Sequence, residues 1–167
     1  MTNSPPSHYP DIGQLGEDLV AQWLQSSGWL ILHRRFSCRW GEIDIIAQYQ
    51  GTQGKHAVNC VPTQKSTLAF VEVKTRSAGN WDAGGRSAIT PKKQAKIWRT
   101  AGMFFANYPE QADYPCRFDV AIVYCQKITQ QFSGEIFTQE LLASSSVGGY
   151  QLQLQEYIPA AFDSVID

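Results

Sequence analysis

The sequence has no long apolar run and no excess of either charge, and both absences narrow what the chain can be. No stretch approaches the roughly 18 apolar residues that a membrane-spanning helix requires. Fourteen Lys and Arg against fifteen Asp and Glu give a net charge of −1, so bulk positive charge cannot hold this chain to nucleic acid. Any such contact has to come from a local basic patch. We expect a cytoplasmic protein without membrane contact.

Cysteine is also scarce, and none of the four cysteines lies in a C-x-x-C motif. This disfavours both a disulfide scaffold and a zinc site. Apolar residues make up 43% of the 167 residues, which suits one folded domain and leaves no room for two separate cores. We expect a flexible tail over 1–10, a core over 11–125, and a C-terminal extension of the same domain over 126–167.

Periodicity along the chain predicts an α/β fold, a mixed β-sheet flanked by helices. Apolar residues at helical spacing indicate a first helix over 12–27, and Thr90-Pro91 marks the start of a second helix that runs to about Asn107. Runs of β-forming residues indicate strands, the third of them central, over 30–36, 41–47, 68–74 and 118–124. We expect connections over 48–67 and 77–88, a hairpin or loop over 126–155, and a short last strand at 156–158.

Some prominent side chains are assigned to structure rather than to chemistry. Trp98 and Phe104 are expected on the buried face of the second helix. Arg117 and Asp119 share one face of a strand, so we expect a structural ion pair between them.

Two carboxylates occupy the middle of apolar strands, where an unpaired charge costs several kcal/mol. Asp44 lies between two isoleucines and Glu72 between two valines. Side chains two residues apart share a strand face, so Glu72 and Lys74 project together, and Asp44 joins them if the two strands pair as a hairpin. On a helical wheel Glu17 also faces inward. The sequence therefore predicts a cluster of these four residues.

The predicted cluster carries three negative charges against one positive charge, so it repels itself unless it binds a divalent cation or takes up a proton. Oxygen ligands suit Mg²⁺ or Mn²⁺. Asp44, Glu72 and Glu17 are the candidate ligands, and Lys74 would orient a nucleophile or neutralise developing negative charge. This is the chemistry of phosphodiester hydrolysis. The alternative is a buried network of ion pairs that needs no metal.

These residues belong to an ordered pattern of four segments. In chain order they are Gly16-Glu17, Gly41-Glu42-Ile43-Asp44, Phe70-Val71-Glu72-Val73-Lys74-Thr75-Arg76 and Arg117-Phe118-Asp119-Val120. The pattern resembles the PD-(D/E)XK nuclease superfamily, and more narrowly the uncharacterised bacterial YraN-like family, which is related to archaeal Holliday-junction resolvases. The resemblance implies a restriction-endonuclease-like fold, Asp44 and Glu72 as metal ligands, Lys74 as the catalytic lysine and Glu17 as a resolvase-like helix glutamate. It implies a metal-dependent endonuclease acting on DNA, including branched or structured DNA, and prompts the hypothesis of a homodimer.

Charge placement favours nucleic acid as the partner. Residues 74–99 hold seven Lys or Arg against one Asp, and Lys92, Lys96 and Arg99 share one helical face that can contact a phosphate backbone. The residues expected to bind DNA are Arg76, Arg86, Lys92, Lys93, Lys96 and Arg99. The alternatives are a solvated helix face for these cations and, for the whole protein, a non-catalytic nucleic-acid-binding or partner-docking module on the same fold.

Overall fold

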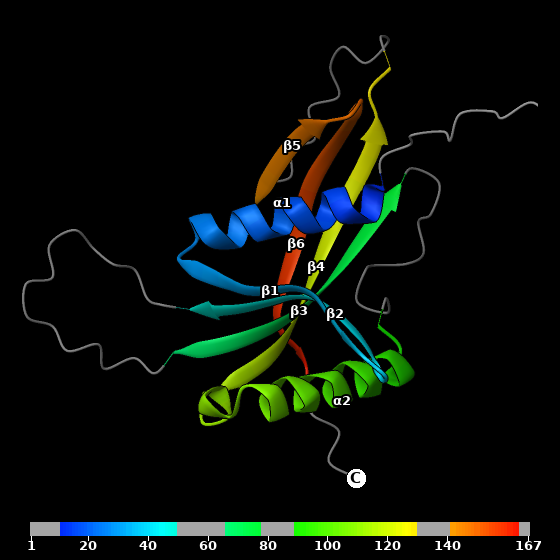
Figure 1. The fold of residues 1–167 in the computed structure, drawn as a ribbon. Coiled ribbons are helices and arrows are strands. Elements are labelled where there is room, and N and C mark those ends of the chain that lie inside the picture. The colour runs from blue at the N-terminus through cyan, green and yellow to red at the C-terminus, as the bar shows by residue number, and fades with distance from the viewer. Residues whose placement is uncertain (1–10, 50–65, 78–88, 130–140, 164–167) are drawn as a thin grey trace, which may run out of the picture.

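A six-stranded mixed sheet carries the fold, with one helix on each of its faces (Figure 1). The computed structural model describes residues 11–49, 66–77, 89–129 and 141–163. Within these ranges the chain confirms the predicted single α/β domain and is consistent with a restriction-endonuclease-like core. The predictions for the tail 1–10, for Arg86 and for most of the connections over 48–67 and 77–88 lie outside the described residues.

The strands follow the order β1-β2-β3-β4-β6-β5. Their bounds are β1 Trp29–Cys38, β2 Gly41–Tyr49, β3 Thr67–Ser77, β4 Cys116–Lys127, β5 Ala143–Val147 and β6 Tyr150–Phe162. β3 and β4 pair in parallel, and the other neighbouring pairs are antiparallel. β3 therefore has partners on both sides, which confirms the prediction of a central strand.

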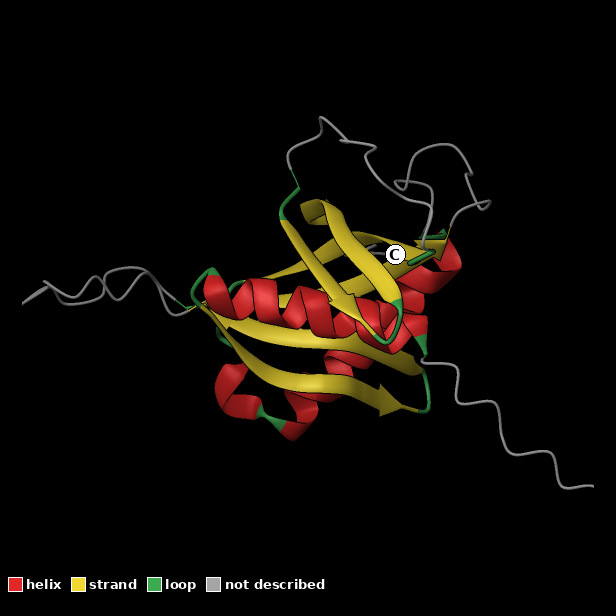
Figure 2. Ribbon diagram, turned by 90° about the horizontal axis from the view of Figure 1, so that it is seen from above, coloured by secondary structure: helices red, strands yellow, loops and turns green. Residues whose placement is uncertain are grey.

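The helices α1 (Ile12–Ser26) and α2 (Pro91–Asn107) cover opposite faces of the sheet, and the view from above shows α1 lying across the strands (Figure 2). α1 begins after Asp11, whose carboxylate accepts hydrogen bonds from the backbone N–H groups of Gly13 and Gln14. α2 begins after Thr90, whose hydroxyl accepts one from the backbone N–H of Lys93. This confirms the predicted start of the second helix. A 3₁₀ helix, η2 (Pro109–Gln111), follows α2. None of the described helices is long and apolar enough to cross a membrane.

Each face of the sheet carries its own apolar core. The core under α1 includes Leu24 and Val71, and the core under α2 includes Phe104 and Phe70. Trp98 was expected on the buried face of α2, but its side chain is 44% exposed. The stripe that faces the sheet contains Ile97, and the next residue lies about 100° further round the helix, which turns Trp98 away from it.

The C-terminal part is more ordered than predicted. The expected short strand at 156–158 is wrong in extent, because β6 spans thirteen residues and begins inside the Gln-rich stretch. Leu152 and Leu154 are buried there between glutamines, and a strand with one buried face needs apolar residues only at alternate positions. β5 and β6 meet at Gly148-Gly149, whose φ values of 57° and 80° favour glycine.

Candidate functional site

Asp44 and Glu72 lie opposite each other where β2 and β3 separate. The antiparallel pairing of the two strands extends as far as Ile45 and Val71, so Asp44 and Glu72 occupy the next position of the register. Here Asp44 Oδ2 accepts a hydrogen bond from the backbone N–H of Val73 at 2.7 Å. A side-chain carboxylate thus takes the place of a backbone acceptor, and the hairpin brings the two acids together as the sequence predicted.

Glu72 is only 4% exposed and contacts two lysines with one of its oxygens. Its Oε1 lies 2.9 Å from Lys74 Nζ and 3.1 Å from Lys93 Nζ. The contact with Lys74 follows from their shared strand face, whereas Lys93 reaches the site from α2. The other oxygen, Oε2, is buried and has no hydrogen-bond partner among the described residues. Glu72 therefore keeps one buried acceptor that no described residue satisfies.

Asp44 is the acid whose charge is least well supported. Burial, and then the neighbouring charge of Glu72, raises the pKa of Asp44 from 3.8 to about 7, although the hydrogen bond from Val73 opposes the shift. Within the described ranges Asp44 forms no ion pair with a lysine or arginine. Near neutral pH this carboxyl group is therefore partly protonated, and a bound cation would favour its charged form.

Glu17 is buried on α1, as the helical wheel predicted, and its charge is balanced by arginines of β1. Arg35 donates two hydrogen bonds, from Nε to Oε2 at 2.9 Å and from Nη2 to Oε1 at 3.0 Å. Arg34 Nη2 lies 3.5 Å from the same Oε2. The pKa of Arg35 is raised by its hydrogen bond to Glu17 and by the charge of that carboxylate. Both oxygens of Glu17 thus already have cationic partners.

The structure changes the charge count on which the metal prediction rested. Sequence reasoning set Lys74 alone against three acids, but the fold adds Lys93 beside Glu72 and two arginines beside Glu17. Such long-range partners cannot be found from local spacing. The shortage of positive charge is therefore confined to Asp44 and to the unsatisfied oxygen of Glu72.

The residues at this point fit a small hard cation. Across the described ranges no three His, Cys, Asp or Glu side chains are grouped to hold a metal ion. Mg²⁺ typically needs only one or two carboxylates, because water and substrate phosphate complete its coordination. Asp44 and Glu72 provide two carboxylates, one of them with an unpartnered buried oxygen. Glu17 as a third ligand stays a prediction, since its oxygens contact arginine.

The cations expected to bind DNA are divided between two roles. Lys92, Lys96 and Arg99 are exposed on α2. Lys93 is half-buried and contacts Glu72. Arg76 is half-buried near the end of β3. Three of the α2 cations thus remain on the surface, and Lys93 joins the acidic site.

Arg117 and Asp119 form the expected structural pair, within a larger network that the sequence did not show. Asp119 is fully buried and accepts hydrogen bonds from Arg117 Nε at 3.0 Å, Tyr157 Oη at 2.6 Å and the backbone N–H of Ala160 at 2.9 Å. Burial, together with the charge of Asp119, raises the pKa of Tyr157. Because both oxygens of Asp119 are satisfied, this network is a structural support for β4 and β6.

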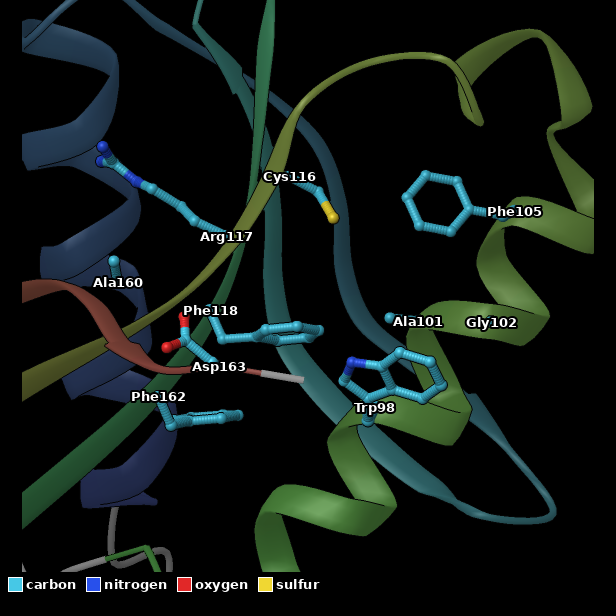
Figure 3. Close-up of a pocket in the computed structure, with 10 residues that line it drawn as sticks. All are labelled: Trp98, Ala101, Gly102, Phe105, Cys116, Arg117, Phe118, Ala160, Phe162 and Asp163. Carbon is cyan, nitrogen blue, oxygen red and sulfur yellow. The ribbon is translucent and has the colours of Figure 1, made fainter. Parts of the chain in front are cut away.

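An apolar cavity of about 350 Å³ lies between α2 and the strands β4 and β6 (Figure 3). Trp98 and Phe105 of α2 face Phe118 and Phe162, whose rings stack with centroids 5.2 Å apart. Neither this cavity nor a neighbouring one of about 370 Å³ is lined by Asp44, Glu72 or Lys74. The two cavities do not define the acidic site.

The fold and the site together define a class: a mixed α/β domain that places two acids and a lysine where two central strands separate. Comparison with known proteins identifies the family. The family model described as "Uncharacterised protein family UPF0102" matches residues 16–123. The chain is similar to a UPF0102 protein of Trichormus variabilis, 64% identical over 157 residues, which cover 94% of this chain and 97% of the relative. It is also similar to a UPF0102 protein of Trichodesmium erythraeum, 47% identical over 164 residues, which cover 91% and 88%. This protein belongs to the UPF0102 family, in agreement with the YraN-like resemblance of its motifs.

Proposed function

We propose that this protein is a Mg²⁺- or Mn²⁺-dependent endonuclease that hydrolyses phosphodiester bonds in DNA. The observation that supports the proposal is the pair of acids at the end of the β2–β3 ladder, of which Glu72 is buried and Asp44 half-buried. One has a pKa raised to about 7 and the other has an unpartnered oxygen. Lys74 lies 2.9 Å from the second acid. A carboxyl group whose pKa is strongly shifted by burial and by a neighbouring charge, as that of Asp44 is, marks a candidate functional site.

Asp44 and Glu72 would hold the cation, and Lys74 would act beside it. A bound divalent cation would supply Lewis-acid stabilisation of a phosphoryl oxygen and a lowered pKa for water. Lys74 Nζ is held by Glu72 while its side chain stays 34% exposed, so its charge can neutralise negative charge that develops on the phosphate. Lys93 contacts the same oxygen from the α2 side and adds a second positive charge.

The raised pKa of Asp44 makes the proposed activity depend on pH. Asp44 has to lose its proton to act as a ligand, and that proton leaves at about pH 7 in the absence of a cation. Cation affinity should therefore increase as the pH rises toward and past this value, because the cation competes with the proton for the same oxygen atoms.

The test is cleavage of linear and branched DNA by the full chain, with Mg²⁺ or Mn²⁺ and with EDTA. The variants Glu72→Gln and Lys74→Met should lose about 100-fold or more in rate, the usual cost of removing a group that stabilises transition-state charge. Glu110→Gln and Lys127→Met are matched controls, because both side chains are exposed, and they should cleave like the wild type. No cleavage by the wild type, or equal cleavage by Glu72→Gln and Lys74→Met, contradicts the proposal.

A non-catalytic DNA-binding module on the same fold is the second candidate. The contacts of Glu72 with Lys74 and Lys93 favour it, since this part of the site is paired without a metal. DNA binding that persists in EDTA, combined with no cleavage under any metal condition, would identify this second function.

A further inference from the structure

A second charged site lies at the tip of the β1–β2 hairpin. The tip consists of Arg39 and Trp40, and it rests against α2 (Figure 1). Cys38 Sγ donates a hydrogen bond to Thr100 Oγ1 of α2 at 3.6 Å. The backbone of Gly41 passes so close to the helix that a Cβ there would lie 3.6 Å from the Cβ of Lys96. The tip is therefore fixed on α2.

Trp40 brings two guanidinium groups together. Cζ of Arg39, its sequence neighbour, lies 4.9 Å from the centroid of the Trp40 ring, and Cζ of Arg99 on α2 lies 5.0 Å from it. The two cations are consequently no more than about 10 Å apart, although like charges repel. The aromatic face offsets part of that repulsion, because its negative quadrupole attracts both cations. We call Arg39, Trp40 and Arg99 the hairpin clamp.

Among the described residues, the arginines of the hairpin clamp lack the carboxylate partners that other arginines of the protein have. Arg34, Arg35 and Arg117 all form ion pairs with carboxylates. Within the part of the chain that the structure describes, neither Arg39 nor Arg99 does so. A guanidinium stacked on a ring keeps its N–H donors at its edge, where they can bind an anion. The fold thus arranges the clamp, and no carboxylate of the described ranges neutralises it.

The hairpin clamp is connected to the acidic site by a line of positive charge on α2. Lys93 contacts Glu72, Lys96 lies beside the hairpin tip, and Arg99 lies over Trp40. Lys93 and Arg99 are six positions apart, which corresponds to about 9 Å along the helix axis. A line of cations matches a linear polyanion better than a planar anionic surface such as a membrane. Nucleic acid presents such a line, with one negative charge per ~1.7 Å of duplex axis.

We propose that the hairpin clamp binds the phosphate backbone of the DNA beside the acidic site, with Arg39 and Arg99 as the phosphate contacts and Trp40 as the residue that positions them. The inference rests on the proposed function for its choice of DNA, and it adds a binding site outside the acidic cluster. Trp40 acts through the two arginines, so its replacement weakens binding without changing the net charge of the protein.

The test is the affinity of the full chain for a short labelled duplex, measured by fluorescence anisotropy in EDTA over a range of NaCl concentrations. Arg39→Gln and Arg99→Gln should each weaken binding about fivefold or more and reduce the salt slope by about 1. Trp40→Leu should weaken binding to a similar degree, and Trp40→Phe should restore part of the loss, because a ring remains for the cations. Urea midpoints near that of the wild type verify that these surface variants fold.

Two variants serve as matched controls. Trp98→Leu removes an exposed tryptophan of α2 at the apolar cavity, and Lys127→Gln removes an exposed cation at the end of β4. Both should bind DNA like the wild type. The clamp is refuted if Trp40→Leu binds DNA as tightly as the wild type, if the controls lose as much affinity, or if the wild type binds anionic lipid vesicles and not DNA.

The outcome is separable from that of the proposed function. Clamp variants that bind weakly, in a protein that never cleaves DNA, support the clamp and contradict the nuclease. Cleavage by a wild type whose clamp variants bind normally supports the nuclease and contradicts the clamp.

Discussion

Replacing Asp44 with Asn should raise the free energy of unfolding at about pH 8. The amide keeps the shape of the side chain and removes a charge that burial and Glu72 disfavour. Its oxygen can still accept the hydrogen bond that Asp44 Oδ2 accepts from the backbone N–H of Val73. The variant therefore isolates the cost of the charge from the loss of a contact.

The size of the effect follows from the pKa of Asp44. A rise from 3.8 to about 7 means that the folded state holds the proton more tightly than the unfolded chain. Stability is therefore lost as the pH rises from about 4 through 7, and the loss is complete above about pH 7. At about 1.4 kcal/mol per pKa unit the upper limit is about 4 kcal/mol. Because the side chain is only half-buried, we expect about 2 kcal/mol at pH 8 and less than half of that at pH 5.

The assay is urea unfolding in EDTA, followed by tryptophan fluorescence near pH 5 and near pH 8. Asp113→Asn is the control, since its carboxylate is exposed, and it should change stability by no more than about 0.5 kcal/mol at either pH. A gain from Asp44→Asn that is absent at pH 8, or larger at pH 5 than at pH 8, refutes the reasoning. Mn²⁺ should raise the Tm of the wild type at about pH 8 and leave that of Asp44→Asn nearly unchanged, because a ligand stabilises only the state that binds it.

Two further predictions concern the structural parts of the fold. Gly16→Ala should lower the free energy of unfolding by about 1 to 3 kcal/mol, because a Cβ there would collide with the side chain of Thr75. Gly102→Ala, where a Cβ meets nothing, should raise it by about 1 kcal/mol; urea unfolding in which the two variants shift in the same direction contradicts the close contact. Tyr157→Phe should cost about 1 to 3 kcal/mol, because Asp119 loses its 2.6 Å hydrogen bond. A thermal unfolding curve equal to that of the wild type would disprove that contribution.

The elements that local chemistry determines were predictable from the sequence. Thr90 ahead of Pro91 specifies a helix start whatever packs around it. The Thr90 hydroxyl accepts a hydrogen bond from a backbone N–H of the first turn, and an N–H at the position of Pro91 would have no partner within the helix. The apolar run around Glu72 requires a strand buried on both faces, which is what β3 is. Strand alternation likewise placed Lys74 beside Glu72 without any knowledge of the fold.

The partners that come from distant segments were not predictable in this way. Lys93 and Glu72 meet because α2 packs on the sheet face toward which the Glu72 side chain projects. No local sequence pattern encodes that packing. Arg35, which hydrogen-bonds Glu17, has a φ of 50°. This left-handed conformation is uncommon for arginine, so the sequence does not predict it. The length of β6 was underestimated for a different reason, since only 156–158 was predicted as a strand. Its glutamines suggested a loop, while the alternation with Leu152 and Leu154 was the better signal.

Two aspartates of this sheet, Asp119 buried and Asp44 half-buried, show why the site at Asp44 supports a functional proposal. Asp119 is fully enclosed on β4, and the fold gives it an arginine, a tyrosine hydroxyl and a backbone N–H. This chain can therefore satisfy a buried carboxylate completely. Asp44 on β2 receives one backbone N–H and a neighbouring acid instead. The fold therefore leaves the negative charge of Asp44 poorly stabilised, although it stabilises that of Asp119 in the same sheet. The folded state is less stable than it would be with a fully hydrogen-bonded Asp44. Binding of a cation at that position would recover the loss.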